Sequence, residues 1–335
     1  MPPDFKKLKQ PFDKPPTTTD QQLELLRSRG LIISDAARAK RLIERVSYAK
    51  LGGYFYLLEL PPVHKKRSHR FKENTKFADI EQLYGLDQQV SAILLPVLFA
   101  IELAMRSRLS DLVCMATESA FWHHEQHVFR TEALARKDPE TPSVYDALHH
   151  QFISLIQKNE NVNFVKHHLD NYQTSYKLPF WLLKELLSFD KIIQLYISLE
   201  TRHQKQVAKG FPGRADQFIN YLRFSSYMRN FCAHNGRLIG TEYIHKVAHK
   251  SEIKGLLRNT LIPKPNWELP SELKTAIIVI HLMSKFFKVE TDFIQHLEDL
   301  LMGFDKNDDY PFLKFDQYWF TEIQETNYSA DYRGN

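Results

Sequence analysis

The chain has 335 residues, of which 43% are hydrophobic and 25% charged, a composition typical of a soluble globular protein. No apolar run approaches the roughly 20 residues of a membrane-spanning helix, and the N-terminal segment lacks the apolar core of a secretory signal. Two distant cysteines, Cys114 and Cys232, exclude a disulfide framework and a Cys-x-x-Cys metal pair. We therefore expect a cytoplasmic protein without a membrane partner.

The net charge of +5 is distributed unevenly along the chain. Residues 1–76 carry 17 Lys and Arg against 8 Asp and Glu, whereas residues 289–335 carry 3 against 11. A basic N-terminal region suits a polyanion such as nucleic acid. A solvated surface explains the same charge, and both interpretations stay open.

The chain begins with an expected irregular arm, because five prolines fall within residues 1–17. A helix should follow, with Thr19 as its N-cap, Gln22 completing a capping box and Gly30 ending it. A second helix is expected over residues 34–48 from its apolar spacing.

These helices belong to a small basic module, residues 18–77, which fits either a helix-turn-helix or a plain helical hairpin. Gly52-Gly53 and Pro61-Pro62 are expected to interrupt regular structure there. The basic loop HKKRSHR follows, and an exposed flexible turn is its alternative interpretation. Its candidate RNA-binding residues are Lys65, Lys66, Arg67 and Arg70.

Residues 78–302 are expected to form a helical bundle, beginning with one long amphipathic run over 86–116 that Pro96 should kink. Few stretches alternate as strands do, and the chain has 11 glycines, so the predicted fold class is all-α. The acidic tail, residues 303–335, keeps aromatic residues and is expected to dock on the bundle. Further helices are expected near residues 142–158, 161–171, 179–199, 214–234 and 270–301.

The segment RNFCAH, from Arg229 to His234, carries the chemistry needed to cleave RNA without a metal. A guanidinium holds a phosphate through paired hydrogen bonds, and an imidazole moves a proton near neutral pH. Asn230 can hold a phosphate oxygen or orient the histidine. An ion pair for Arg229 and a helix-capping role for His234 would explain the same residues structurally.

The spacing within this segment limits how it can act. Five helical steps of about 100° separate the side chains of Arg229 and His234 by about 140°. Either the helix end distorts, or two chains serve one phosphate, which predicts a homodimer with a shared groove. Gly236, in the following Asn-Gly pair, is expected to take the left-handed position that ends the helix.

Other candidate residues favour structural roles. His123 and His127 have the spacing of zinc ligands, but no HExxH motif is present, and a solvated segment without metal is expected. The pairs His149-His150 and His167-His168 are expected at the surface. The sequence also lacks the motifs of P-loop, dinucleotide-binding and serine-hydrolase enzymes.

Glu102 and Glu185 are single carboxylates on apolar helix faces, where a buried charge needs a partner. Arg106, four residues after Glu102, can supply it. Either glutamate can instead contact Arg229 or His234 and orient that side chain without contacting the RNA.

A series of blocks along the chain resembles one family, over about residues 17–285. The blocks are TTTDQQLELLRSRGLIISD, AKLGGY, FADIEQLYGLDQQVSAILLPVLFAIELAMRSRL, PFWLLKELLSFDKIIQLY and RNFCAHNGRL. In this order they are similar to the Abi-like family of bacterial abortive-infection proteins, which is placed in the HEPN superfamily. HEPN ribonucleases carry an arginine, a polar residue and a later histidine, a pattern that Arg229, Asn230 and His234 match. AKLGGY and Asp190 depart from the family pattern, and Asp190 is expected to affect packing.

The resemblance implies a HEPN bundle that dimerises around one cleft and cleaves RNA without metal or cofactor. The 2′-OH of the RNA attacks, leaving a 2′,3′-cyclic phosphate and a 5′-OH. His234 would be general base or acid, Arg229 would stabilise the phosphoryl charge, and Asn230 would position an oxygen. Arg237 is a further candidate RNA contact.

The resemblance also implies a toxin of phage defence, restrained until infection, in a family where some members pair with a small noncoding RNA. The basic N-terminal region is a candidate platform for that RNA. Two other functions stay open. One is a non-catalytic RNA-binding HEPN module or regulator, and the other is a DNA-binding regulator that uses residues 18–48.

Overall fold

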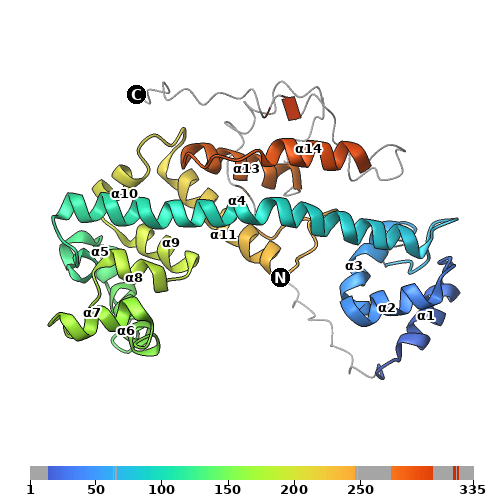
Figure 1. Ribbon diagram of the computed structural model, residues 1–335, viewed down its shortest axis with the longest axis horizontal. Helices are drawn as coiled ribbons and strands as arrows, with labels where there is room; N and C mark the ends of the chain where they lie inside the picture. Colours follow the sequence, from blue (N-terminus) through green and yellow to red (C-terminus); the bar gives the residue numbers. More distant parts are fainter. Residues whose placement is uncertain are drawn as a thin grey trace, which may run out of the picture. The chain divides into compact units, whose positions relative to one another are not determined.

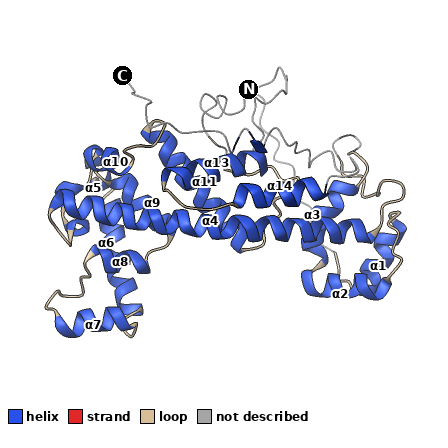
Figure 2. Cartoon of the chain, turned by 45° about the horizontal axis from the view of Figure 1, so that its top comes forward, coloured by secondary structure: helices blue, strands red, loops and turns tan. Residues whose placement is uncertain are grey.

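The computed structural model describes residues 14–62, 64, 66–245, 247, 273–304, 320, 321 and 323. Within these residues the chain consists of helices joined by loops, and its β structure consists of isolated bridges, such as that between Ile32 and Lys76 (Figures 1 and 2). The predicted all-α fold class is confirmed.

The helices differ from the expected ones mainly where two expected helices, over residues 179–199 and 270–301, are each divided in two. The helix expected over residues 179–199 is two helices, because Ser188 caps the second by accepting a hydrogen bond from the Lys191 N–H at 3.4 Å. In chain order, the helices are α1 (Thr19–Ser28), α2 (Ala36–Val46), α3 (Tyr48–Leu58), α4 (Phe77–Thr117), η1 (Trp122–His124), η2 (Gln126–Val128), α5 (Thr131–Leu134), α6 (Val144–Lys158), α7 (Asn163–Asn171), α8 (Phe180–Leu186), α9 (Phe189–Ser198), α10 (Thr201–Val207), α11 (Ala215–Ala233), α13 (Leu273–Phe286) and α14 (Phe293–Phe304).

The chain forms two compact units, Met1–Asp87 and Gln88–Asn335. Their boundary falls inside α4, ten residues beyond the boundary expected at 77/78. The finer division, with an arm over 1–17 and a tail over 303–335, stays a prediction.

In the N-terminal unit, α1 packs against α2 and α2 against α3. The N-cap of α1 is Thr18 and not Thr19, which corrects the sequence analysis by one residue. Thr18 Oγ1 accepts from the Gln21 N–H at 3.3 Å, and Gln21 Oε1 accepts from the Thr18 N–H at 2.8 Å. Consecutive threonines and glutamines offer the same capping box twice, and this register buries Leu23 and Leu26.

The helix α3 runs through Gly52-Gly53, so the expected interruption there was wrong. Its buried residues, Leu51, Tyr54 and Phe55, hold the glycines in a helix that glycine alone disfavours. The helix does end before Pro61-Pro62, as expected.

The helix α4 passes through Pro96 without a break in its assigned span. An 18-residue window of α4 has a mean hydropathy of 1.8, so by length and composition this helix is able to cross a membrane. That corrects the expectation of no such stretch. However, 44% of the window is buried inside the protein, and core helices of globular bundles have the same properties.

In the second unit, α11 packs against both α9 and α13. The helix α13 is buried on nearly every side, as expected for a central helix. A hydrogen bond joins α4 to α11, because Ser91 Oγ of α4 donates to the Cys232 carbonyl oxygen of α11 at 3.4 Å. Two described residues of the tail, Phe320 and Ile323, are buried, in agreement with docking of that segment.

Candidate active site

The C-terminal end of α11 fixes where the motif stops being helical. The Asn235 N–H donates to the Cys232 carbonyl at 3.0 Å and the Gly236 N–H to the Phe231 carbonyl at 2.6 Å, the two bonds of a Schellman motif. Asn235 takes the left-handed position, with φ of 53°, which corrects the expectation for Gly236. Gly236 is needed for another reason, because a Cβ there would lie 2.4 Å from the Phe231 ring.

Arg229 is held from three sides. Its Nε lies 2.9 Å from Glu102 Oε2, and its Nη1 donates to Asn230 Oδ1 at 2.8 Å. Its guanidinium carbon lies 5.2 Å from the centre of the Phe99 ring, a cation–π distance. The side chain still has 28% of its surface exposed, so a positioned guanidinium faces solvent.

Glu102 is the buried carboxylate that organises this site. Its side chain is only 6% exposed and lies between two guanidinium groups, those of Arg106 and Arg229. The predicted Glu102–Arg106 pair is confirmed, and the second pairing joins α4 to α11. Arg106 also donates to the Lys184 carbonyl. One carboxylate between two cations leaves the cluster net positive, which favours an anionic ligand.

His234 is the C-cap of α11 and is exposed. Its backbone N–H donates to the Asn230 carbonyl at 3.0 Å, while its ring makes no hydrogen bond with any described residue. The chain stays α-helical through Ala233, so the turn of about 100° per residue that underlies the expected 140° angle holds as far as Ala233. The regular helix ends before His234, whose own φ of −96° and ψ of 18° depart from helical values, so the first expected route, a distorted helix end, stays open beside the second.

Asn230 also lines a pocket of about 490 Å³ between α9 and α11. Asn230, Tyr227 and Arg223 lie on one face of α11, at the spacing of one and two turns. The lining residues are Arg130, Val144, Asp190, Ile193, Gln194, Ile197, Ser198, Arg223, Tyr227, Asn230 and His245.

Asp190 has a larger role than the sequence predicted. Its Oδ1 accepts a hydrogen bond from Ser226 Oγ at 2.5 Å, which ties α9 to α11 and fits the expected packing role. It also lines the pocket beside Asn230, a position that sequence reasoning missed. The departure of Asp190 from the family pattern was the one signal that pointed to it.

Two further candidates are Glu185 and Arg237. Glu185 is 45% exposed and lies 3.6 Å from Lys184, and it contacts neither Arg229 nor His234 among the described residues. Arg237 is half-buried, three residues after His234.

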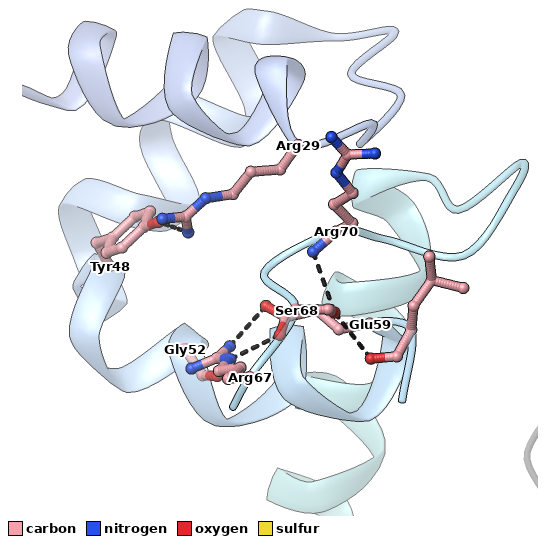
Figure 3. A network of polar contacts seen from close by, with 8 residues as sticks. Arg29, Tyr48, Gly52, Glu59, Arg67, Ser68 and Arg70 are labelled. Atoms are coloured by element: carbon pink, nitrogen blue, oxygen red, sulfur yellow. Dashed lines mark hydrogen bonds and ion pairs between the residues drawn. The ribbon is translucent and has the colours of Figure 1, made fainter. Parts of the chain in front are cut away.

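The basic loop belongs to the N-terminal unit, where Arg67 is committed to an intramolecular partner (Figure 3). Its Nε and Nη2 bind the two oxygens of Glu59 at 2.6 and 2.7 Å, and Nη2 also donates to the Gly52 carbonyl at 3.2 Å. Lys66 and Arg70 are exposed. Lys65 lies outside the described residues.

The histidine-rich segment is solvated only in part: Gln126 and His127 are exposed, as expected, but His123 is not. His123 is fully buried, because Trp122, Phe152 and Phe180 surround it. The ring of His124 stacks on that of His149 with centroids 4.7 Å apart.

Burial lowers the pKa of His123 well below its usual value and that of His124 to about 4. His168 is also buried, against the expected surface position. Within the described residues no three His, Cys, Asp or Glu side chains are grouped to hold a metal ion.

The comparisons with known proteins bear on the same region. The family model of the Abi-like proteins matches residues 41–240, which is more than half of the chain. The match includes the whole segment from Arg229 to His234, Glu102 and most of the pocket lining. Neither the curated proteins nor the solved structures gave a match. The chain belongs to the Abi-like protein family.

Proposed function

We propose that this chain is a metal-independent endoribonuclease of an abortive-infection system. The observation that carries the proposal is the geometry at the end of α11. There a guanidinium positioned by Glu102 and Asn230 lies five residues before an exposed histidine at the helix C-cap. Membership of the Abi-like family supports phage defence as the setting.

The reaction uses groups that the site leaves available. Arg229 Nη2 has no partner among the described residues, so it can donate to a phosphoryl oxygen while Nε and Nη1 stay bound. The RNA 2′-oxygen forms a bond to phosphorus as the bond to the 5′-oxygen breaks, giving a 2′,3′-cyclic phosphate and a 5′-OH. His234 transfers a proton at the attacking or at the leaving oxygen.

The proposed site takes residues from both protomers of a homodimer. On a regular helix the side chains of Arg229 and His234 would point about 140° apart, so in the proposal one phosphate is bound by Arg229 of one protomer and the partner's His234. The α4 surface beside Arg229 supports a partner, because Phe99 and Leu103 are 46% and 57% exposed. Large exposed apolar side chains next to a functional site are typical of an interface.

The cleavage test compares wild type with His234→Ala and Arg229→Ala on a labelled RNA, with EDTA present. We expect cleavage by wild type alone and growth arrest on expression that either substitution relieves. If all three proteins bind the RNA and none cleaves it, the result would contradict the nuclease and favour a non-catalytic RNA-binding module. Loss of wild-type cleavage in EDTA would contradict a metal-independent reaction.

The dimer test mixes the two inactive variants. A mixed dimer has one intact arginine and one intact histidine on different protomers. Recovery of a fraction of wild-type cleavage, together with a dimer mass in light scattering, is the expected result. A fully active monomer would exclude the shared site.

A further inference from the structure

The pocket beside Asn230 contains two arginines without an internal partner. Arg130 and Arg223 form no ion pair or side-chain hydrogen bond with any residue in the described part of the chain. The Nε of Arg130 is buried and without an acceptor. A buried donor without a partner is destabilising, so it marks a place where a ligand oxygen would be bound. Two such cations lining one pocket favour a phosphate.

Helix α9 supplies an acidic and an amide side chain to the same pocket. Asp190 and Gln194 are one turn apart, and each is oriented by a neighbour. Ser226 holds Asp190 Oδ1 at 2.5 Å, and Lys191 Nζ donates to Gln194 Oε1 at 3.0 Å. This leaves a carboxylate oxygen as acceptor and an amide NH₂ as donor.

Apolar side chains and a ring complete the pocket. Ile193 and Ile197 come from α9, and Tyr227 comes from α11. The half-buried Tyr227 ring lies 4.9 Å from that of His245, so an aromatic pair borders the pocket. Aromatic faces and apolar walls bind nucleobases by stacking, and hydrogen-bonding groups at the edge select among them.

We propose that this pocket binds one nucleotide, with its phosphate on Arg130 and Arg223 and its base against Tyr227, where Asp190 accepts from an N–H of the base. The volume of about 490 Å³ lies within the range of about 300–1,000 Å³ that small-ligand pockets have. Because Asn230 joins the pocket to Arg229, the occupant is the RNA residue beside the scissile phosphate, and this part rests on the proposed ribonuclease function. A free nucleotide has the same chemistry and is the competing source.

Binding is measured with the full-length His234→Ala protein and a fluorescent RNA decamer, with each nucleoside 5′-monophosphate as competitor. Arg223→Ala should weaken RNA binding about tenfold, because a charge-assisted contact is lost. Ile197→Trp should do the same by filling the pocket. Arg202→Ala removes an exposed arginine outside the pocket and should change nothing.

Cleavage by the protein with His234 intact tests the base contact. Asp190→Asn keeps the size of the side chain, exchanges an acceptor for a donor, and should change the base preference beside the cut about tenfold. If Asp190→Asn and Ile197→Trp both keep the wild-type base preference and RNA affinity, the proposed nucleotide pocket is contradicted, while the proposed nuclease is not. Monophosphates that bind more tightly than the RNA would overturn it in favour of a free nucleotide. No cleavage by wild type would instead overturn the proposed function.

Discussion

Replacing Glu102 with glutamine tests whether the buried carboxylate positions Arg229. The substitution keeps the shape of the side chain but removes the charge between Arg106 and Arg229. Breaking a fully buried ion pair costs about 3–5 kcal/mol. Arg229 is 28% exposed and a glutamine oxygen still accepts one hydrogen bond, so we expect a smaller cost, about 2–3 kcal/mol.

Two measurements follow from this estimate. The melting temperature should fall by about 4–12 °C, since 1 kcal/mol shifts a domain of this size by about 2–4 °C. Single-turnover RNA cleavage at 25 °C, where the variant stays folded, should slow about 100-fold because the guanidinium loses its position. Glu102→Asp should recover part of the stability through its charge.

Glu185→Gln is the matched control. That carboxylate is 45% exposed and its ion pair with Lys184 spans 3.6 Å, so its removal should change stability by less than about 1 kcal/mol and leave cleavage unchanged. Equal stability and equal activity of Glu102→Gln and Glu185→Gln would contradict a positioning role for Glu102.

Three further predictions concern other parts of the chain. The free energy of unfolding should be highest above pH 6.5 and fall towards pH 4, because the buried ring of His123 and the half-buried ring of His124 have a lowered pKa and the unfolded chain binds more protons there. For the half-buried His124, with a pKa of about 4, the loss in thermal or urea unfolding should be about 2 kcal/mol, since solvent screening reduces the effect of the shift. Gly236→Ala should destabilise by about 1–3 kcal/mol in thermal unfolding and slow cleavage, since the new Cβ collides with Phe231. Arg67→Ala should destabilise the N-terminal unit by about 3 kcal/mol in limited proteolysis, because it leaves a buried carboxylate unpaired.

Each of these predictions has a control in the same chain. His124→Phe should flatten the pH dependence, whereas replacing the exposed His150 with glutamine should not. Gly303→Ala, with no atom within 4 Å of the new Cβ, should not destabilise. Arg70→Ala should keep the fold and lower RNA affinity in a salt-dependent way if the loop binds RNA. A flat pH profile, a stable Gly236→Ala protein or an Arg67→Ala protein as protease-resistant as Arg70→Ala would contradict the respective explanation.

Local patterns in the sequence predicted much of the fold. Apolar spacing located α6, α7 and α11 closely, because one face of each packs on the core. The Glu102–Arg106 pair followed from a spacing of four residues on one helix. The capping box was displaced by one residue because Thr18 and Thr19 satisfy the same local rule, and only burial of the apolar side chains selects between them.

Features that depend on distant residues were not predictable in this way. His123 is buried by Phe152 and Phe180, which adjoin it only in the folded chain. The pocket likewise brings together Arg130 and Arg223, and no local pattern indicates that both line it. The sequence therefore located the motif but not the pocket beside it.

The chemical ends of the RNA fragments test the central claim most directly. Wild-type protein and His234→Ala are incubated with one RNA in EDTA, and the products are analysed by mass spectrometry. We predict fragments with 2′,3′-cyclic phosphate and 5′-OH ends from wild type and none from His234→Ala. Fragments with 5′-phosphate ends, or equal cleavage by both proteins, would contradict the account.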